Sequence, residues 1–236
     1  MGKTTLAAMA PNPVFIGCDD GGSETLNPKT KQPVLHVPDV ESFGDVRAVL
    51  QSNIFDDHET VVLDTVTMLQ YWALPYIFRT IPHDKAGTVV TSIEGYGYGK
   101  GYRHLFDVMH AVLADCDRLV RQGKNVILIA QEATIPETNT SGENYFKAGP
   151  DLQHGDKASI RKDYVAWVDH VFRITWEHAK VEDRKINPVK GRVINIKPDA
   201  TFEAKSRGTA FADCETVTFT EPSDDSLWTL LFGEET

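Results

Sequence analysis

Apolar residues in this chain form short unbroken runs that are separated by stretches with helical spacing. The runs at 14–18, 61–63 and 126–130 predict buried strands, because they lack the alternation of a half-exposed strand. The segments 39–52 and 103–121 carry apolar residues three and four positions apart, which is typical of amphipathic helices. Buried strands that alternate with such helices predict an α/β protein with helices on both faces of a mainly parallel sheet.

The second half of the chain follows the first without a linker or an internal repeat. A long polar stretch at 132–160 predicts a loop that is functional or disordered. The segments 192–196 and 201–204 predict a C-terminal β-hairpin. The end of the chain is acidic with one apolar cluster. We therefore expect one domain over residues 1–220 and a short tail over 221–236.

The charge balance limits the partners of the protein. Its 236 residues include 24 Lys and Arg against 34 Asp and Glu, which gives a formal net charge of −10. Such a chain does not coat nucleic acid or an anionic membrane by bulk charge, so DNA binding requires a local basic patch or a surface formed by assembly. Cys18, Cys116 and Cys214 lack the spacing of a zinc site or a disulfide framework. We expect no membrane partner and a reducing, cytoplasmic compartment.

The most informative motif lies at the start of the sequence. Gly2-Lys3-Thr4-Thr5 matches the second half of the phosphate-binding loop G-x-x-x-x-G-K-[ST], although four residues can also match by chance. In that loop Lys3 would reach the β- and γ-phosphates of ATP, Thr4 would enter the Mg²⁺ shell, and Thr5 would support the α-phosphate. The first glycine of the pattern and the strand before it would precede Met1. We therefore expect either a longer natural chain or impaired nucleotide binding.

Polar residues follow each of the three predicted strands. Asp64 suits a place in the Mg²⁺ shell, held through water, but an Asp that only caps the next helix would have the same sequence. Asp19 and Asp20 would polarise an attacking water, or would simply form a turn with the glycines that follow. Gln131 would sense the γ-phosphate, or would merely begin a loop. With the phosphate-binding motif, these residues predict a site for ATP and Mg²⁺.

Six segments occur in an order and spacing that are more specific than any one of them: Gly2-Lys3-Thr4-Thr5, Cys18-Asp19-Asp20-Gly21, Val61-Val62-Leu63-Asp64, Gly95-Tyr96-Gly97-Tyr98-Gly99-Lys100-Gly101-Tyr102, Gln131 and Ala204-Lys205-Ser206-Arg207. Over residues 1–207 this order resembles the RecA-like branch of P-loop ATPases, most closely phage-encoded nucleotide-binding proteins of the recombinase or single-strand-annealing type. The resemblance implies a RecA-like three-layer α/β/α fold. It also implies ATP hydrolysis to ADP and phosphate, and DNA recombination in the cytoplasm of a phage-infected or prophage-carrying bacterium.

The resemblance assigns roles to three further residues. Asp20 would be the catalytic base, at a position where the family usually has Glu. Lys205 and Arg207 would reach the γ-phosphate bound by a neighbouring subunit, or would be a solvated strand end. These roles imply a homo-oligomer, either a ring or a filament.

Two loops, 84–103 and 132–162, fall where RecA-like proteins hold single-stranded DNA. Aromatic side chains with interleaved cations suit stacking on bases, although Gly–Tyr repeats also suit a packed surface loop. We expect single-stranded DNA as a partner, and a single-strand-binding protein as a further candidate. The expected DNA-binding residues are Tyr96, Tyr98, Lys100, Tyr102, Arg103, Tyr145, Phe146, Lys147 and Arg161.

Two other functions fit the same motifs. One is a non-catalytic assembly module that keeps the fold without nucleotide turnover, in line with the incomplete phosphate-binding loop. The other is a P-loop ATPase of the helicase-loader or kinase type that has no recombination activity. Binding of Mg²⁺-ATP separates the first of these from the enzymatic alternatives.

Overall fold

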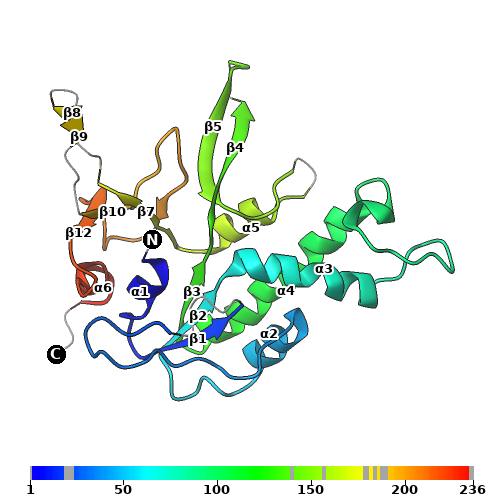
Figure 1. The fold of residues 1–236 in the computed structure, drawn as a ribbon, viewed down its shortest axis with the longest axis horizontal. Coiled ribbons are helices and arrows are strands. Elements are labelled where there is room, and N and C mark those ends of the chain that lie inside the picture. The colour runs from blue at the N-terminus through cyan, green and yellow to red at the C-terminus, as the bar shows by residue number, and fades with distance from the viewer. Residues whose placement is uncertain are drawn as a thin grey trace.

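The computed structural model describes residues 2–18, 24–138, 141–155, 158–177, 181–182, 185–186 and 191–233 (Figure 1). Its centre is a parallel sheet of three strands, β1 (Pro13–Gly17), β2 (Thr60–Asp64) and β3 (Asn125–Ile129), in the order β1-β2-β3. The register pairs Gly17 with Asp64 and Asp64 with Ile129, so the three strands end at the same edge. The three strands expected from the apolar runs are confirmed, as is their parallel arrangement.

Helices cover one face of this sheet. They are α2 (Phe43–Leu50), α3 (Val66–Thr80), α4 (Lys100–Arg121) and α5 (Ile160–Trp167), and they share a hydrophobic core with Val61 and Leu63 of β2. Between these two residues Val62 points to the opposite face, where it packs with Ala7 and Ala8. Burial on both faces explains why β2 is apolar without alternation, since only a strand covered on both sides has no solvent-facing positions.

The short helix α1 (Lys3–Ala7) lies on that second face of the sheet. It is held from the other side by α6 (Ser226–Phe232), whose Trp228 indole nitrogen donates a hydrogen bond to the Leu6 carbonyl at 2.8 Å. The apolar cluster near the end of the chain is therefore part of the core around α1. In Figure 1, α6 lies beside α1 although the two helices come from opposite ends of the sequence.

A second sheet contains β7 (Arg173–Trp176), β10 (Arg192–Asn195) and β12 (Thr216–Phe219), antiparallel in the order β12-β10-β7. The hairpin expected from 192–196 and 201–204 does not form, because β10 pairs with β7 and β12 instead. Strands from distant parts of the chain provide these partners, which local sequence patterns do not report. The short pairs are β6 (His170–Val171) with β11 (Lys205–Ser206), and β8 (Val181–Glu182) with β9 (Lys185–Ile186).

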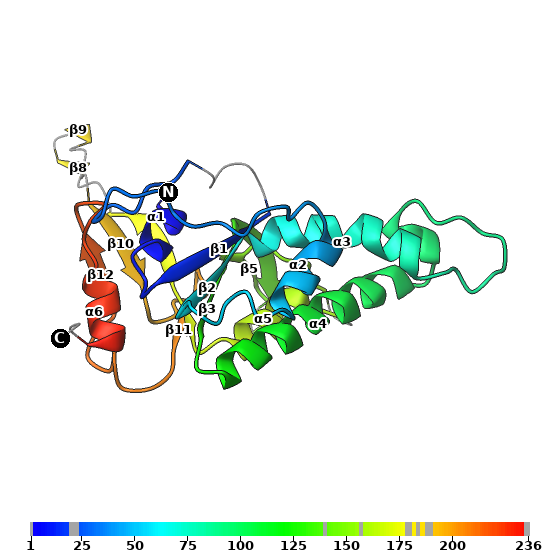
Figure 2. The ribbon, with the colours of Figure 1, turned by 90° about the horizontal axis from the view of Figure 1, so that it is seen from below.

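Two projections leave the body of the protein. The expected loop at 132–160 instead contains a hairpin of β4 (Glu132–Thr138) and β5 (Asn144–Pro150), which rises from the sheet in Figure 1. Exposed and half-buried residues alternate along β4, as in a strand with one face toward solvent. The sequence does not show this alternation, because most residues of β4 are polar. In Figure 2, α3 and α4 extend side by side beyond the sheet, joined by a segment with the 3₁₀ helix η2 (Ile93–Tyr96). None of the described helices is long and apolar enough to cross a membrane.

Candidate functional site

The centre of the candidate site is a contact between α1 and the end of β2. The Thr4 hydroxyl oxygen Oγ1 donates a hydrogen bond to the Asp64 carboxylate oxygen Oδ2 over 2.6 Å. Asp64 is buried at the carboxyl end of β2, and Thr65 after it caps α3 by accepting the Met68 amide. The two residues that were predicted independently as magnesium-shell positions therefore lie together.

Local packing fixes the start of α1. Gly2 precedes the helix with φ of 89°, in the left-handed region that favours glycine, and its carbonyl accepts the Leu6 amide at 2.9 Å. Leu6 and Ala7 are buried, so the helix is anchored and the position of Lys3 relative to the sheet follows from it. Thr5 belongs to the same first turn. The four residues of the motif thus lie at one place, beside the carboxyl end of β2.

Gln131 lies at the same edge, two residues after the end of β3. Its amide nitrogen donates to Thr67 Oγ1 at 3.0 Å, and its carbonyl accepts the Asp151 amide at 2.8 Å. These bonds hold the backbone of Gln131 between α3 and the segment after β5. Lys3, the predicted phosphate-binding lysine, and Gln131, the predicted sensor, line the same cavity.

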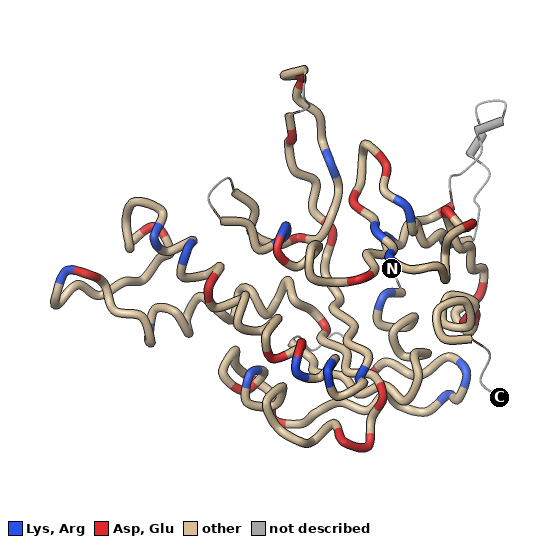
Figure 3. The backbone as a smooth tube through the Cα atoms, turned by 180° about the vertical axis from the view of Figure 1, so that it is seen from behind, with Lys and Arg blue, Asp and Glu red and all other residues tan. Residues whose placement is uncertain are grey.

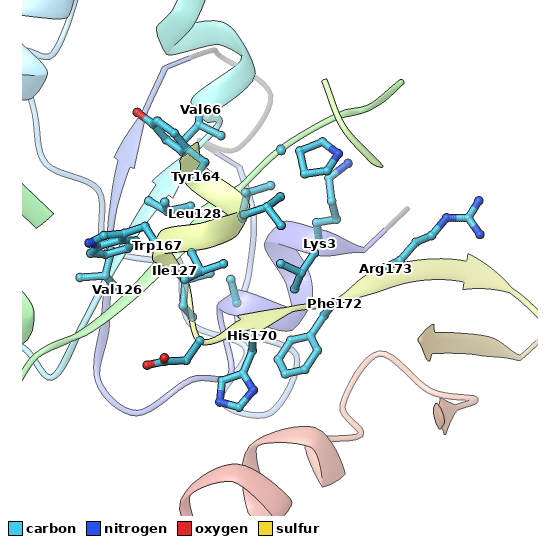
Figure 4. A pocket seen from close by; sticks show the side chains of 18 of the residues that line it. Lys3, Val66, Val126, Ile127, Leu128, Tyr164, Trp167, His170, Phe172 and Arg173 are labelled. Carbon is cyan, nitrogen blue, oxygen red and sulfur yellow. The ribbon is translucent and has the colours of Figure 1, made fainter. Parts of the chain in front are cut away.

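This cavity has a volume of about 610 Å³ and lies along β3. Figure 4 shows Ile127 and Leu128 of β3 on one side and Phe172 on the other, with Lys3 at the wall formed by α1. Arg173 and Ile174 of β7 belong to the lining as well. Within the described part of the chain, β3 has a strand partner only in β2, and β7 only in β10. The cavity therefore lies between the two sheets, with the edge strand β3 of the first sheet on one side and the edge strand β7 of the second sheet on the other.

The other predicted catalytic residues do not contact Thr4 or Asp64 within the described part of the chain. Asp20 is outside the described residues. The Lys205 ammonium donates to the carbonyls of Val165, Ala166 and Val168 at the end of α5, at 2.6–3.0 Å. Arg207 Nη2 donates to the Ala166 carbonyl at 3.1 Å. Burial, followed by the charge of Arg207, lowers the pKa of Lys205. Both side chains thus contact the end of α5 in their own subunit, and their role in a neighbouring subunit stays a prediction.

The predicted DNA-binding residues divide into buried, paired and exposed groups. Tyr96 is buried, with its hydroxyl donating to the Ile81 carbonyl at 2.7 Å, and the Arg161 side chain is fully buried. Neither presents a surface on which a base could stack. Tyr102 donates to Glu94 at 2.7 Å and Tyr145 donates to Glu137 at 3.0 Å.

The two predicted DNA-binding cations of the loop 84–103 are also paired. Lys100 pairs with Asp84, and Arg103 pairs with Asp107 at 3.0 Å. Figure 3 shows Lys and Arg interspersed with Asp and Glu along the projection formed by α3 and α4. Tyr98 and Phe146 remain as large exposed aromatic side chains, and Lys147, next to Phe146, is half-buried. These three keep the surface position that nucleic-acid binding requires.

Sequence reasoning missed one cation at the start of α1. Arg192, the first residue of β10, packs against the backbone of Gly2, where a side-chain Cβ would overlap its Nη1. Arg192 reaches this position through the pairing of β10 with β7, and no local pattern in the sequence indicates that pairing.

Comparison with known proteins agrees with this geometry. A family model described as an AAA domain matches residues 1–208, which include all the residues at the carboxyl edge of the β1–β3 sheet. A search of curated proteins gave no match.

Proposed function

Because the chain belongs to the AAA-domain family of nucleotide-binding P-loop ATPases, we propose that it binds ATP with Mg²⁺ at the carboxyl edge of β1–β3. The observation that carries the proposal is the Thr4–Asp64 hydrogen bond of 2.6 Å. A hydroxyl and a carboxylate side by side are the oxygen groups that Mg²⁺ prefers, together with nucleotide phosphates. The residues present therefore fit the group that the family implies.

Each residue has a task that its chemistry allows. Lys3 supplies a point charge to the phosphates from the wall of the cavity, while Thr4 and Asp64 hold the metal shell. Bound Mg²⁺ would neutralise charge that develops on the phosphates during hydrolysis. Gln131 is the proposed sensor of the γ-phosphate, and two hydrogen bonds fix its backbone beyond the end of β3. Asp20 remains the proposed base, and Lys205 and Arg207 the proposed residues for a neighbouring subunit.

We also propose the RecA-like arrangement of strands. In that arrangement a further parallel strand would lie next to β3. The cavity along β3 supports this proposal, because apolar residues such as Ile127, Leu128 and Phe172 line it and the strands that border it are the last of their sheets. An apolar strand in this position would join the two sheets and would end beside Lys3, which lines the same cavity.

Titration calorimetry with Mg²⁺-ATP tests the nucleotide site. Lys3→Ala is expected to weaken binding by about tenfold to a hundredfold, because a hydrogen bond to a charged group contributes about 1.5–3 kcal/mol. Lys29→Ala is the matched control, since Lys29 is half-exposed and pairs with Asp225 near α6. Equal affinity for ATP in the wild-type protein and in Lys3→Ala would place the nucleotide elsewhere.

A second proposed activity is binding of single-stranded DNA by an oligomer, in recombination or annealing. Exposed aromatic side chains on two separate projections, Tyr98 at 102% and Phe146 at 69% of full exposure, favour it. Bases stack on aromatic faces without sequence preference, with about 1–3 kcal/mol for each base. The net charge of −10 requires that assembly bring these projections together around the strand.

Fluorescence anisotropy of a labelled oligothymidine tests this second activity. The variant Tyr98→Ala and the variant Phe146→Ala are each expected to weaken binding by tenfold or more. Tyr71→Ala is the control, because Tyr71 is half-exposed on α3. A loss of affinity that is equal in all three variants, or absent from all of them, would contradict DNA binding through these projections.

A further inference from the structure

Arg192 is held in place by aromatic residues on both neighbouring strands. In the register of the second sheet it lies opposite Trp176 of β7 and Phe219 of β12. Its guanidinium carbon Cζ is 5.0 Å from the centre of the Trp176 ring and 6.0 Å from that of Phe219. A cation over an aromatic face is attracted by the ring quadrupole, so the two rings give the guanidinium a defined position.

That position is against the first residue of the phosphate-binding motif. A Cβ atom on Gly2 would overlap Arg192 Nη1 and would lie 3.1 Å from Cζ, so the guanidinium occupies the space beside the Gly2 backbone. Lys3 and Thr4 follow immediately in the chain. The guanidinium of Arg192 therefore lies at the entrance to the motif that the proposed function assigns to the nucleotide phosphates.

No carboxylate among the described residues pairs with Arg192. Within the described ranges the Arg192 side chain makes no hydrogen bond or ion pair with the protein. Arg173, at the other end of β7 from Trp176, also lies over an aromatic ring, that of Phe202, but is paired with Glu132 at 2.5 Å. Arg47 and Arg161 are likewise paired with carboxylates. The donors of Arg192 thus remain available for an anion from outside the protein.

We propose that Arg192 binds the phosphates of the nucleotide in cis, together with Lys3. The inference rests on the proposed function and adds a second cation to the same site. Arginine presents a planar fork of N–H donors that matches phosphate oxygens in pairs, whereas lysine contributes a single point charge. The two aromatic rings hold this fork in position before the nucleotide arrives, which reduces the side-chain entropy lost on binding.

Titration of ATP and of adenosine into the wild-type protein, Arg192→Gln, Arg192→Lys and Arg79→Gln tests the proposal. Arg192→Gln is expected to weaken Mg²⁺-ATP binding by about tenfold to a hundredfold. Arg192→Lys is expected to recover only part of the loss, because the charge returns without the fork. Adenosine, which has no phosphates, should bind equally to all four proteins. Arg79→Gln should bind ATP as the wild type does, because Arg79 is exposed in the last turn of α3.

The outcomes separate this inference from the proposed function. If Arg192→Gln binds ATP as tightly as the wild type while Lys3→Ala does not, Arg192 is no phosphate ligand and the nucleotide site stands. Equal losses for ATP and adenosine in Arg192→Gln would also overturn the inference, because they indicate a general distortion of the site. If the wild-type protein binds no ATP, both proposals fail. Thermal melting of each variant shows whether it is folded, and Arg192→Lys keeps the comparison informative if Arg192→Gln is not.

Discussion

Removing the carboxylate of Glu203 should destabilise the protein strongly. Arg161 on α5 is fully buried, and its Nε donates to Glu203 Oε2 at 2.9 Å. Its Nη1 and Nη2 are also buried and have no hydrogen-bond partner in the part of the chain described. The guanidinium packs so closely on Gly149 of β5 that a Cβ there would overlap it. In this pocket Glu203 is the counter-charge on which Arg161 depends.

The substitution Glu203→Gln would leave a buried and uncompensated positive charge. Breaking a buried ion pair from one side costs about 3–5 kcal/mol, out of a total free energy of unfolding of about 5–15 kcal/mol for a typical domain. Urea unfolding followed by tryptophan fluorescence measures the loss as a lower midpoint with an unchanged slope.

The matched control is Asp169→Asn, which breaks the exposed pair of Asp169 with Arg207 at 3.2 Å. Exposed pairs contribute about 0–1 kcal/mol, so this variant should unfold near the wild-type midpoint. A loss below about 1 kcal/mol for Glu203→Gln, similar to that of the control, would refute the argument that a buried charge is at stake.

Three further predictions concern the site and its surroundings. Asp64→Asn should raise the Mg²⁺ concentration needed for ATP binding by about tenfold or more, seen in a metal titration, because the amide cannot replace the charged acceptor of Thr4. Gly2→Ala should lower both the melting temperature and the affinity for ATP, because it forces a side chain into the left-handed region and displaces Arg192. Burial lowers the pKa of His170 from 6.5, so its imidazole binds a proton more readily in the unfolded protein than in the folded one. The free energy of unfolding should therefore decrease as the pH drops below about 6.5. The urea midpoint should decrease between pH 7.5 and pH 5.5, and this decrease should be smaller in His170→Gln.

The parallel sheet could be predicted from the sequence because its physics is local. Strands β1 and β2 are mostly buried and β3 is half-buried along the cavity, and all three appear in the sequence as short apolar runs. The Thr4–Asp64 contact joined two motifs that had each been assigned to the magnesium shell by their chemistry. Parallel strands present their carboxyl ends at one edge, so the fold itself brought the assigned residues together.

The rest of the site depends on pairings between distant segments. The partners of β10 are β7 and β12, where the sequence favoured a local hairpin, and this pairing is what places Arg192 beside Gly2. The sequence predicts Tyr96 as a DNA-binding residue because aromatic side chains and cations are interleaved in its loop, but its hydroxyl donates to the Ile77 and Ile81 carbonyls in the core. Arg161 was expected to bind DNA because it is basic, yet Glu203, far along the chain, allows it to be buried.

A crystal structure with Mg²⁺ and a non-hydrolysable ATP analogue tests the central claim most directly. We predict the phosphates within hydrogen-bond distance of Lys3 Nζ and of the Arg192 guanidinium. We predict the metal next to the Thr4 hydroxyl, with Asp64 in its shell directly or through water. A nucleotide bound away from the carboxyl edge of β1–β3, or a metal without Thr4 and Asp64 beside it, would contradict the account.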